Sequence, residues 1–270
     1  MYNIMLHVFG DQAQESRLQC ALDLVRLTQA HLHCVQTLPI DPYVTTDLYG
    51  GAFIAAEILT DIRAEQAKAR AAMEARLQAE GVSWSWSERS GDPVRSLIRE
   101  AKLADAVLIS QSAPDNPELQ PALPLASDLV LASPAPVFII PQSAMSFQPG
   151  DPALICWNGS SEGARALRLA MPFLARASSV HVLQIDEPQD LFPATEAGEY
   201  LSRHGIEADI HLRQSAGENV DQVILETARM LRAGYIVLGA YGHSRMREAL
   251  LGGVTRNLLA HSDIPLLMAH

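Results

Sequence analysis

Short apolar runs alternate with longer amphipathic segments along the whole chain. A continuous apolar run predicts a strand buried on both faces of a parallel sheet, and an amphipathic segment between two such runs predicts a crossover helix. The pattern predicts strands at residues 3–9, 32–38, 82–88, 105–110, 136–140, 153–157, 179–185, 207–213, 235–239 and 265–269. It predicts helices at residues 12–30, 53–79, 93–103, 123–132, 160–176, 195–204, 218–232 and 253–261.

The order of these elements repeats, and so do some of the residues. Residues 90–94 read Ser-Gly-Asp-Pro-Val and open the helix before the strand at 105–110. Residues 216–220 read Ala-Gly-Glu-Asn-Val and open the helix before the strand at 235–239. In both places a glycine precedes an acidic residue, which suits the positive end of a helix dipole. The repeat indicates a duplicated unit.

Each copy has the elements of a doubly wound domain. We expect an α/β protein of two tandem domains, each a five-stranded parallel sheet with about four helices, at residues 1–141 and 153–270. The linker from Pro141 to Pro152 is rich in Pro, Ser, Gln and Gly. In sheets of this type ligands bind beyond the carboxyl ends of the strands, where the strand order reverses.

Composition narrows the classes of partner. The net charge is −11 and no Lys/Arg cluster occurs, which argues against nucleic acid as a partner. No apolar run approaches the roughly 18 residues of a membrane span, so we expect no membrane partner. The three cysteines (Cys20, Cys34 and Cys156) occur singly, as is typical of reduced thiols, and we expect a cytoplasmic protein.

A glycine-containing segment follows the strand at 235–239. Gly239, Gly242 and Gly252 have the spacing G-x2-G-x9-G, and the segment ends where the helix at 253–261 begins. Glycines allow the backbone to approach a ligand closely, and a helix start offers unpaired N–H groups, so the segment could cradle an anion. In the alternative interpretation these glycines only turn the chain.

This spacing matches the phosphate loop of ATP-binding universal stress proteins, and the chain resembles that family over nearly its whole length. The tail Gly-Val-Thr-Arg at residues 253–256 is also similar to the family. The two-copy layout resembles the tandem members, in which two units pack as a dimer within one chain. The resemblance implies a regulatory, non-catalytic stress-response protein that binds an adenine nucleotide, ATP with or without Mg²⁺.

The resemblance also implies which residues hold the nucleotide. The loop glycines and the amides of Gly253 and Val254 would hold phosphates, with a hydroxyl from Thr255. Asn158 would lie near the nucleoside, and the backbone of Ile185 would contact adenine. Gly253 stands where the family usually has Ser or Thr, and Asn158 where it usually has Asp. His243, within the loop, is a further candidate for a phosphate contact. The implied set is therefore Asn158, Ile185, Gly239, Gly242, His243, Gly252, Gly253, Val254 and Thr255.

The first copy lacks such a loop. Its fourth strand is followed at residues 110–117 by Ser-Gln-Ser-Ala-Pro-Asp-Asn-Pro, and no glycine occurs between Gly91 and Gly150. Proline also removes a backbone donor. We expect this domain to be degenerate, with a structural role or a different ligand.

No catalytic residue or metal ligand emerges from the pattern. G-x-S-x-G and G-x4-G-K-[ST] are both absent, which leaves a serine hydrolase and a P-loop ATPase without support. His31 and His33 share one strand face, which suits ordinary strand histidines or, with His7, a metal site. Residues 43–53 are expected to form a loop. Two other functions stay open: an interaction or scaffold module that has lost nucleotide binding, and a slow ATP hydrolase. A homodimer or another protein partner also fits the sequence.

Overall fold

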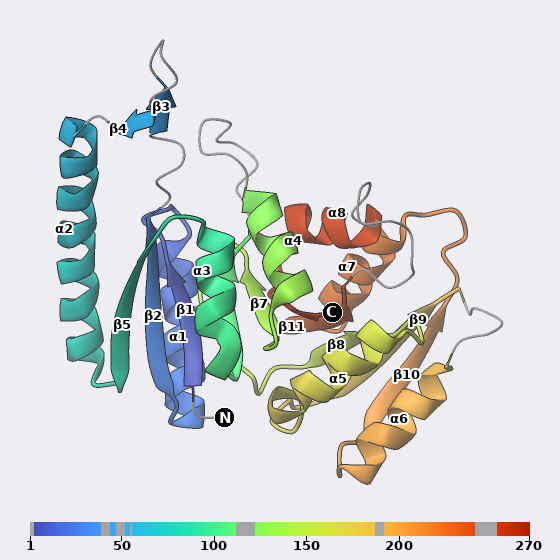
Figure 1. Cartoon of the computed structure of the whole chain (residues 1–270). Helices are drawn as coiled ribbons and strands as arrows, with labels where there is room; N and C mark the ends of the chain where they lie inside the picture. The colour runs from blue at the N-terminus through green and yellow to red at the C-terminus, as the bar shows by residue number, and fades with distance from the viewer. Residues whose placement is uncertain are drawn as a thin grey trace.

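Within the described residues, ten strands form one sheet that runs through the whole molecule (Figure 1). The structure is a computed structural model that describes residues 3–38, 44–46, 52–54, 56–111, 122–186, 192–240 and 253–270. The strands of the sheet are β1 (Asn3–Val8), β2 (His31–Leu38), β5 (Trp84–Ser90), β6 (Ala106–Ser110), β7 (Val137–Ile140), β8 (Ala153–Cys156), β9 (Val180–Ile185), β10 (Ala208–Arg213), β11 (Tyr235–Gly239) and β12 (Leu266–Ala269).

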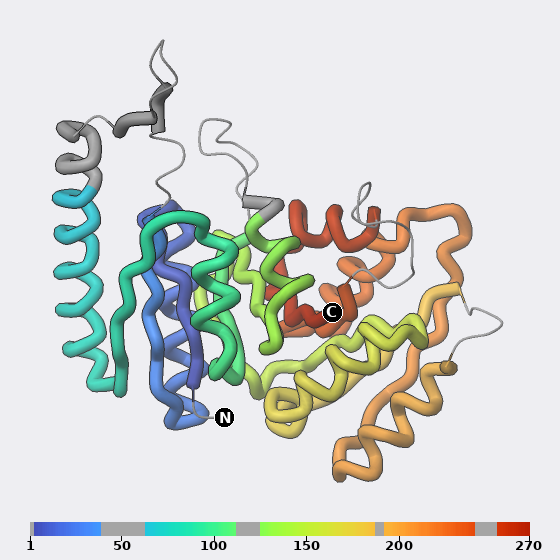
Figure 2. The backbone as a smooth tube through the Cα atoms, in the orientation of Figure 1, coloured from blue at the N-terminus to red at the C-terminus, as the bar shows by residue number. Residues whose placement is uncertain are grey.

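The sheet consists of two parallel halves that meet edge to edge. The order is β10-β9-β8-β11-β12-β7-β6-β1-β2-β5, so each half has the same doubly wound order. All neighbours are parallel except β12 and β7, which pair antiparallel with Leu267 opposite Phe138. The predicted fold of two tandem doubly wound units packed against each other within one chain is confirmed. Figure 2 shows the first half in blue to green on one side and the second in yellow to red on the other.

Eight helices of the described residues cover the two faces of the sheet. Helices α1, α2, α5 and α6 contribute to the core on one face, and α3, α4, α7 and α8 to the core on the other. Both faces are covered, which explains the continuous apolar runs of the central strands. The helices are α1 (Gln14–Thr28), α2 (Ala56–Glu80), α3 (Pro93–Glu100), α4 (Ala122–Ala132), α5 (Ser161–Leu174), α6 (Ala194–Arg203), α7 (Val220–Met230) and α8 (Gly253–His261).

Local signals set several helix ends. The Asp92 side chain accepts hydrogen bonds from the backbone N–H groups of Val94 and Arg95, which caps α3. The Ser160 hydroxyl accepts one from the N–H of Gly163 and caps α5. Gly81 has φ +65° directly after α2, a conformation that glycine adopts without cost. These caps explain why helix positions could be predicted closely.

The segment between β2 and α2 differs from the prediction. Residues 43–53 were expected to form a loop, but β3 (Val44–Thr46) pairs antiparallel with β4 (Ala52–Ile54). The β-branched and aromatic residues Val44, Thr45, Phe53 and Ile54 have high strand propensity, which outweighs the glycines between them.

The linker between the halves is packed into the core. Phe147 is 2% exposed, and its ring meets those of Phe138 and Tyr235 at centroid distances of 5.1 and 5.4 Å. The backbone N–H of Phe147 donates to Asp23 of α1 over 3.1 Å. Aromatic pairs in edge-to-face contact stabilise the folded state by more than the burial of their surface area alone. The linker therefore ties both halves together instead of separating them.

Candidate functional site

The strand order of the C-terminal half reverses between β8 and β11. From β8 the chain continues outward to β9 and β10, and then returns to place β11 on the other side of β8. Helices α5 and α8 lie on opposite faces of the sheet. The carboxyl edge between β8 and β11, which we call the crevice, is where sheets of this type bind ligands. Asn158 lies two residues after the end of β8, and Gly239 is the last residue of β11. The two predicted residues thus lie on the two sides of one crevice.

Gly239 packs against the first turn of α5. A Cβ atom at this position would lie 2.3 Å from the backbone nitrogen of Gly163 and 2.5 Å from the carbonyl carbon of Glu162. No side chain can therefore be accommodated unless the backbone moves. The glycine brings the end of β11 and the start of α5 into direct contact, which is a packing role that the motif alone did not reveal.

Asn158 is tied into the cap of the same helix. Its Oδ1 atom accepts hydrogen bonds from the Ser160 hydroxyl at 2.7 Å and the Ser160 N–H at 3.2 Å. The side chain is exposed, and its Nδ2 group donates to no atom of the described residues. The carbonyl side of Asn158 is thus occupied by α5, whereas its amide N–H groups are available to an acceptor.

Ile185 ends β9 beside the crevice. The Trp157 N–H donates to the carbonyl of Leu183 at 2.8 Å, and the Asp186 N–H donates to Arg213 of β10 at 3.0 Å. Backbone groups of successive strand residues point alternately to the two neighbouring strands. The N–H and C=O of Ile185 therefore point toward the β8 side, where the strand has already ended. This orientation fits the predicted contact between this backbone and an adenine ring.

Helix α8 supplies the third side of the candidate site. The connection from β11 to β12 is a crossover between parallel neighbours, so α8 begins at the sheet edge where β11 ends. Gly253 is exposed, and a Cβ at this position would meet no described atom within 4 Å. The first N–H groups of a helix, here those of Gly253, Val254 and Thr255, have no partner inside the helix. Thr255 is 8% exposed, and its hydroxyl bonds to none of the described residues.

Three predicted residues, Gly242, His243 and Gly252, lie outside the described residues. Among the others, the structure joins Asn158 and Gly239 through the first turn of α5. No hydrogen bond within the described part of the chain connects Asn158 to the start of α8.

One ionised acid lies beside the crevice. Burial raises the pKa of Glu162. Hydrogen bonds from its own backbone N–H and from the hydroxyls of Ser161 and Ser160, together with the charge of His270, lower this pKa by a larger amount, so the net shift is downward. Glu162 belongs to the turn of α5 that contacts Gly239. Glu162 thus carries a negative charge on the α5 side, whereas the start of α8 is the positive end of a helix dipole and favours anions.

The equivalent place in the N-terminal half contains a buried arginine. The strand registers place Ile4 of β1 in the position of Ala153 of β8, so Arg17 of α1 takes the position of Ala166. Arg17 is fully buried. Ser110, the last residue of β6, takes the position of Gly239.

The Arg17 guanidinium is surrounded by acceptors. Nε donates to the carbonyl of His7 at 2.7 Å, and Nη2 donates to the carbonyl of Phe9 at 3.1 Å and to Gln14 Oε1 at 2.7 Å. Nη1 donates to Asp11 Oδ2 at 3.1 Å and to the hydroxyl of Ser110. The side chain thus binds the ends of both strands at the strand reversal of the N-terminal half. The expectation that the first copy has no comparable phosphate site stays a prediction, because residues 112–121 lie outside the described residues.

Sequence reasoning did not identify Arg17, although a signal was present. Leu18, Ala21 and Val25 mark the buried stripe of α1, and Arg17 lies within that stripe. A basic residue on an apolar helix face must be paired when it is buried.

The strand histidines bind neighbouring side chains. His33 contacts Ser85 at 2.9 Å and Glu100 at 3.1 Å, and His31 contacts Ser83 at 2.7 Å and Ser85 at 2.8 Å. His7 contacts the hydroxyl of Thr37, on the neighbouring strand β2, at 2.8 Å. Across the described ranges, no three His, Cys, Asp or Glu side chains are arranged to hold a metal ion.

Comparison with known proteins identifies the family of the second half. The model of the universal stress protein family matches residues 151–270. The C-terminal half of the chain belongs to the universal stress protein family. No curated protein sequence matches the chain. In the described ranges, no helix is long and apolar enough to cross a membrane.

Solved universal stress proteins share the fold of both halves. A universal stress protein from Archaeoglobus fulgidus DSM 4304 superposes with a TM-score of 0.75 at 17% identity, covering 99% of this chain and 97% of that one. A putative universal stress protein from Pseudomonas aeruginosa UCBPP-PA14 gives 0.59 at 22% identity, with coverage of 100% and 93%. The tandem universal stress fold therefore extends over the N-terminal half as well.

Proposed function

We propose that this protein binds an adenine nucleotide, ATP with or without Mg²⁺, in the crevice of its C-terminal half, and that it acts as a regulator in a stress response. The observation that carries the proposal is the placement of the G-x2-G-x9-G segment. It runs from the end of β11 to the start of α8, at the reversal of strand order where doubly wound sheets bind ligands. A helix start and glycines are the elements that bind phosphate.

The crevice suggests how each part of the nucleotide is held. The phosphates would lie at the start of α8, away from Glu162, where the N–H groups of the first turn have no partner within the helix. The adenine would lie beside the backbone of Ile185, whose N–H and C=O point into the crevice. The free amide group of Asn158 would donate to the ribose. Nothing in the described crevice resembles a general base aimed at a phosphate, so the protein is proposed to bind and not to turn over.

A second candidate is an interaction module that has lost nucleotide binding. Two observations favour it: Gly253 brings no hydroxyl to the phosphates, and the carbonyl of Asn158 is already used by Ser160. Pairing of two chains, or of this chain with another protein, remains a prediction from the sequence. A cytoplasmic location is also proposed, because Cys20, Cys34 and Cys156 are free thiols, as is typical of proteins in reducing compartments.

Thermal unfolding of the full chain with MgATP separates the two candidates. A ligand present at 100 times its Kd stabilises the folded state by about 2.7 kcal/mol, which corresponds to a rise in Tm of roughly 5–10 °C. We expect such a rise for ATP and none for Mg²⁺ alone. Hydrolysis is followed in the same samples by phosphate release.

A matched pair of variants tests whether the nucleotide binds at the start of α8. Gly253→Asp and Gly253→Asn add side chains of nearly the same size where no described atom lies within 4 Å, and both residues suit a helix start. Only Asp adds a negative charge, whose repulsion of a phosphate 4 Å away amounts to roughly 1–4 kcal/mol. The ATP-induced shift should therefore fall in Gly253→Asp and persist in Gly253→Asn. No shift in the parent protein would instead support the interaction module.

A further inference from the structure

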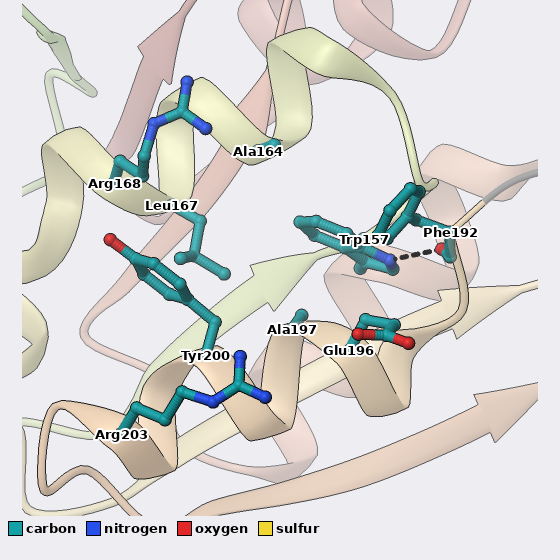
Figure 3. Close-up of a pocket in the computed structure, with 9 residues that line it drawn as sticks. All are labelled: Trp157, Ala164, Leu167, Arg168, Phe192, Glu196, Ala197, Tyr200 and Arg203. Atoms are coloured by element: carbon teal, nitrogen blue, oxygen red, sulfur yellow. Dashed lines mark hydrogen bonds between the residues drawn. The ribbon is translucent and has the colours of Figure 1, made fainter.

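A cavity of about 210 Å³ lies in the groove between α5 and α6 (Figure 3). Leu167 of α5 and Tyr200 of α6 face each other across it, and Ala164 and Ala197 line it from the two helices. The two alanines leave the helices without long side chains at these positions. The space that results is on the α5/α6 face of the sheet, whereas the crevice opens at the sheet edge.

Aromatic rings form the ends of the cavity. Figure 3 shows Trp157 and Phe192 at one end and Tyr200 toward the other, with Leu167 between them. The Trp157 indole N–H donates to the carbonyl of Phe192 at 2.8 Å, which fixes the orientation of the indole. Trp157 is 7% exposed, but Phe192 is 64% exposed. Such walls suit a flat apolar group, because aromatic rings prefer edge or offset contact with other rings.

The charged groups at the rim favour an anion. Arg168 of α5 is exposed and makes no hydrogen bond or ion pair with the described part of the chain. Arg203 of α6 pairs with Glu199 at 2.9 Å. Glu196, also at the rim, is the one acid among the residues that line the cavity. The unpaired positive charge is therefore that of Arg168, which lies on the α5 wall beside Leu167.

We propose that this cavity binds a small planar aromatic carboxylate of one or two rings, independently of nucleotide binding. The ring would lie on Leu167 between Trp157 and Tyr200. The exposed Arg168 side chain, which points away from Leu167 in Figure 3, would rotate toward the carboxylate and donate hydrogen bonds to it. A dry cavity of about 150 Å³ accommodates benzene, so 210 Å³ leaves room for a ring and a short acid chain. Guanidinium groups bind carboxylates in a bidentate manner, which selects acids over neutral analogues.

The test compares indole-3-acetate with indole-3-acetamide, which has the same ring and no charge. Both are titrated into the full chain by calorimetry, with and without MgATP. We expect saturable binding of the acid at one site per chain, at least about tenfold tighter than the amide, since a hydrogen bond to a charged group is typically that strong. The Kd of the acid should not depend on MgATP.

Two arginines of α5 provide the matched variants. Arg168→Gln should reduce binding of the acid to the level of the amide, whereas Arg165→Gln, an equal change of charge at another exposed position of the same helix, should leave it unchanged. Ala164→Leu should fill the cavity and weaken both probes, with its fold checked by circular dichroism. Absence of binding, equal binding of acid and amide, or a preference for the acid that survives Arg168→Gln would each overturn the proposal.

Discussion

Replacement of Gly239 by alanine tests how closely β11 packs on α5. The added Cβ would lie 2.3 Å from the Gly163 nitrogen, 2.5 Å from the Glu162 carbonyl carbon and 2.8 Å from the Gly163 Cα. All three are backbone atoms, so no rotation of a side chain can relieve the clash. Overpacking of a well-packed interior typically costs about 1–3 kcal/mol, and backbone contacts place this substitution at the upper end, near ~3 kcal/mol. At roughly 2–4 °C per kcal/mol, the Tm should fall by about 6–12 °C.

Differential scanning calorimetry of the unliganded chain measures this loss. The matched control is Gly253→Ala, because a Cβ there meets no described atom within 4 Å and alanine is favoured over glycine in helices by up to ~1 kcal/mol. Its Tm should stay the same or rise slightly. A Tm for Gly239→Ala within 1 °C of the parent protein, or an equal loss in both variants, would refute the packing role of Gly239.

Three further predictions concern the site and its counterpart in the first half. Arg17→Met should destabilise the protein by about 3–5 kcal/mol in urea unfolding, because it leaves buried acceptors and Asp11 without their donor. The same change at the exposed Arg165 should alter the stability little. A loss below ~1 kcal/mol for Arg17→Met would contradict this account. Gly253→Ser should strengthen MgATP binding about tenfold by adding a hydroxyl beside the phosphates, measured by calorimetry, and unchanged affinity would place the phosphates elsewhere. Burial, with the nearby charge of Arg17, lowers the pKa of His7 to about 3 from 6.5, so only the unfolded chain takes up this proton between those values. The contribution of neutral His7 to the free energy of unfolding is complete above pH 6.5 and is lost as the pH falls toward 3, by up to ~1.4 kcal/mol per pH unit. His7→Gln should therefore flatten this part of the stability profile, measured by urea titrations at a series of pH values.

The strands and helices could be predicted because both faces of the sheet are buried. Continuous apolar runs such as those of β6 and β11 leave few alternatives once crossover helices lie between them. The pairing of β7 with β12 could not be predicted from the apolar pattern. Apolar patterning shows that both strands are buried, but not that Phe138 lies opposite Leu267. That the halves pack together was implied only by the family resemblance.

The candidate site could be located from the sequence but not described in detail. Motif spacing placed Gly239 in the site, but the contact with Gly163 depends on where α5 begins relative to β11. Likewise, Asn158 was expected to serve a nucleoside, and only the structure shows its carbonyl bound to Ser160. Arg17 was missed because its acceptors are brought together only by folding: Asp11 and Gln14 lie within six residues of it, His7 and Phe9 ten and eight residues away, and Ser110 far away in sequence.

The central claim is that the chain has one nucleotide site and that it lies in the C-terminal half. The measurement that tests it most directly is the stoichiometry of MgATP binding to the full chain, determined by isothermal titration calorimetry with the protein concentration fixed by amino-acid analysis. The account predicts one nucleotide per chain, with the site lost in Gly253→Asp and kept in Gly253→Asn. Two nucleotides per chain would show that the first copy also binds a nucleotide and would contradict the claim of a single site, and no binding heat at several temperatures would contradict the proposed function itself.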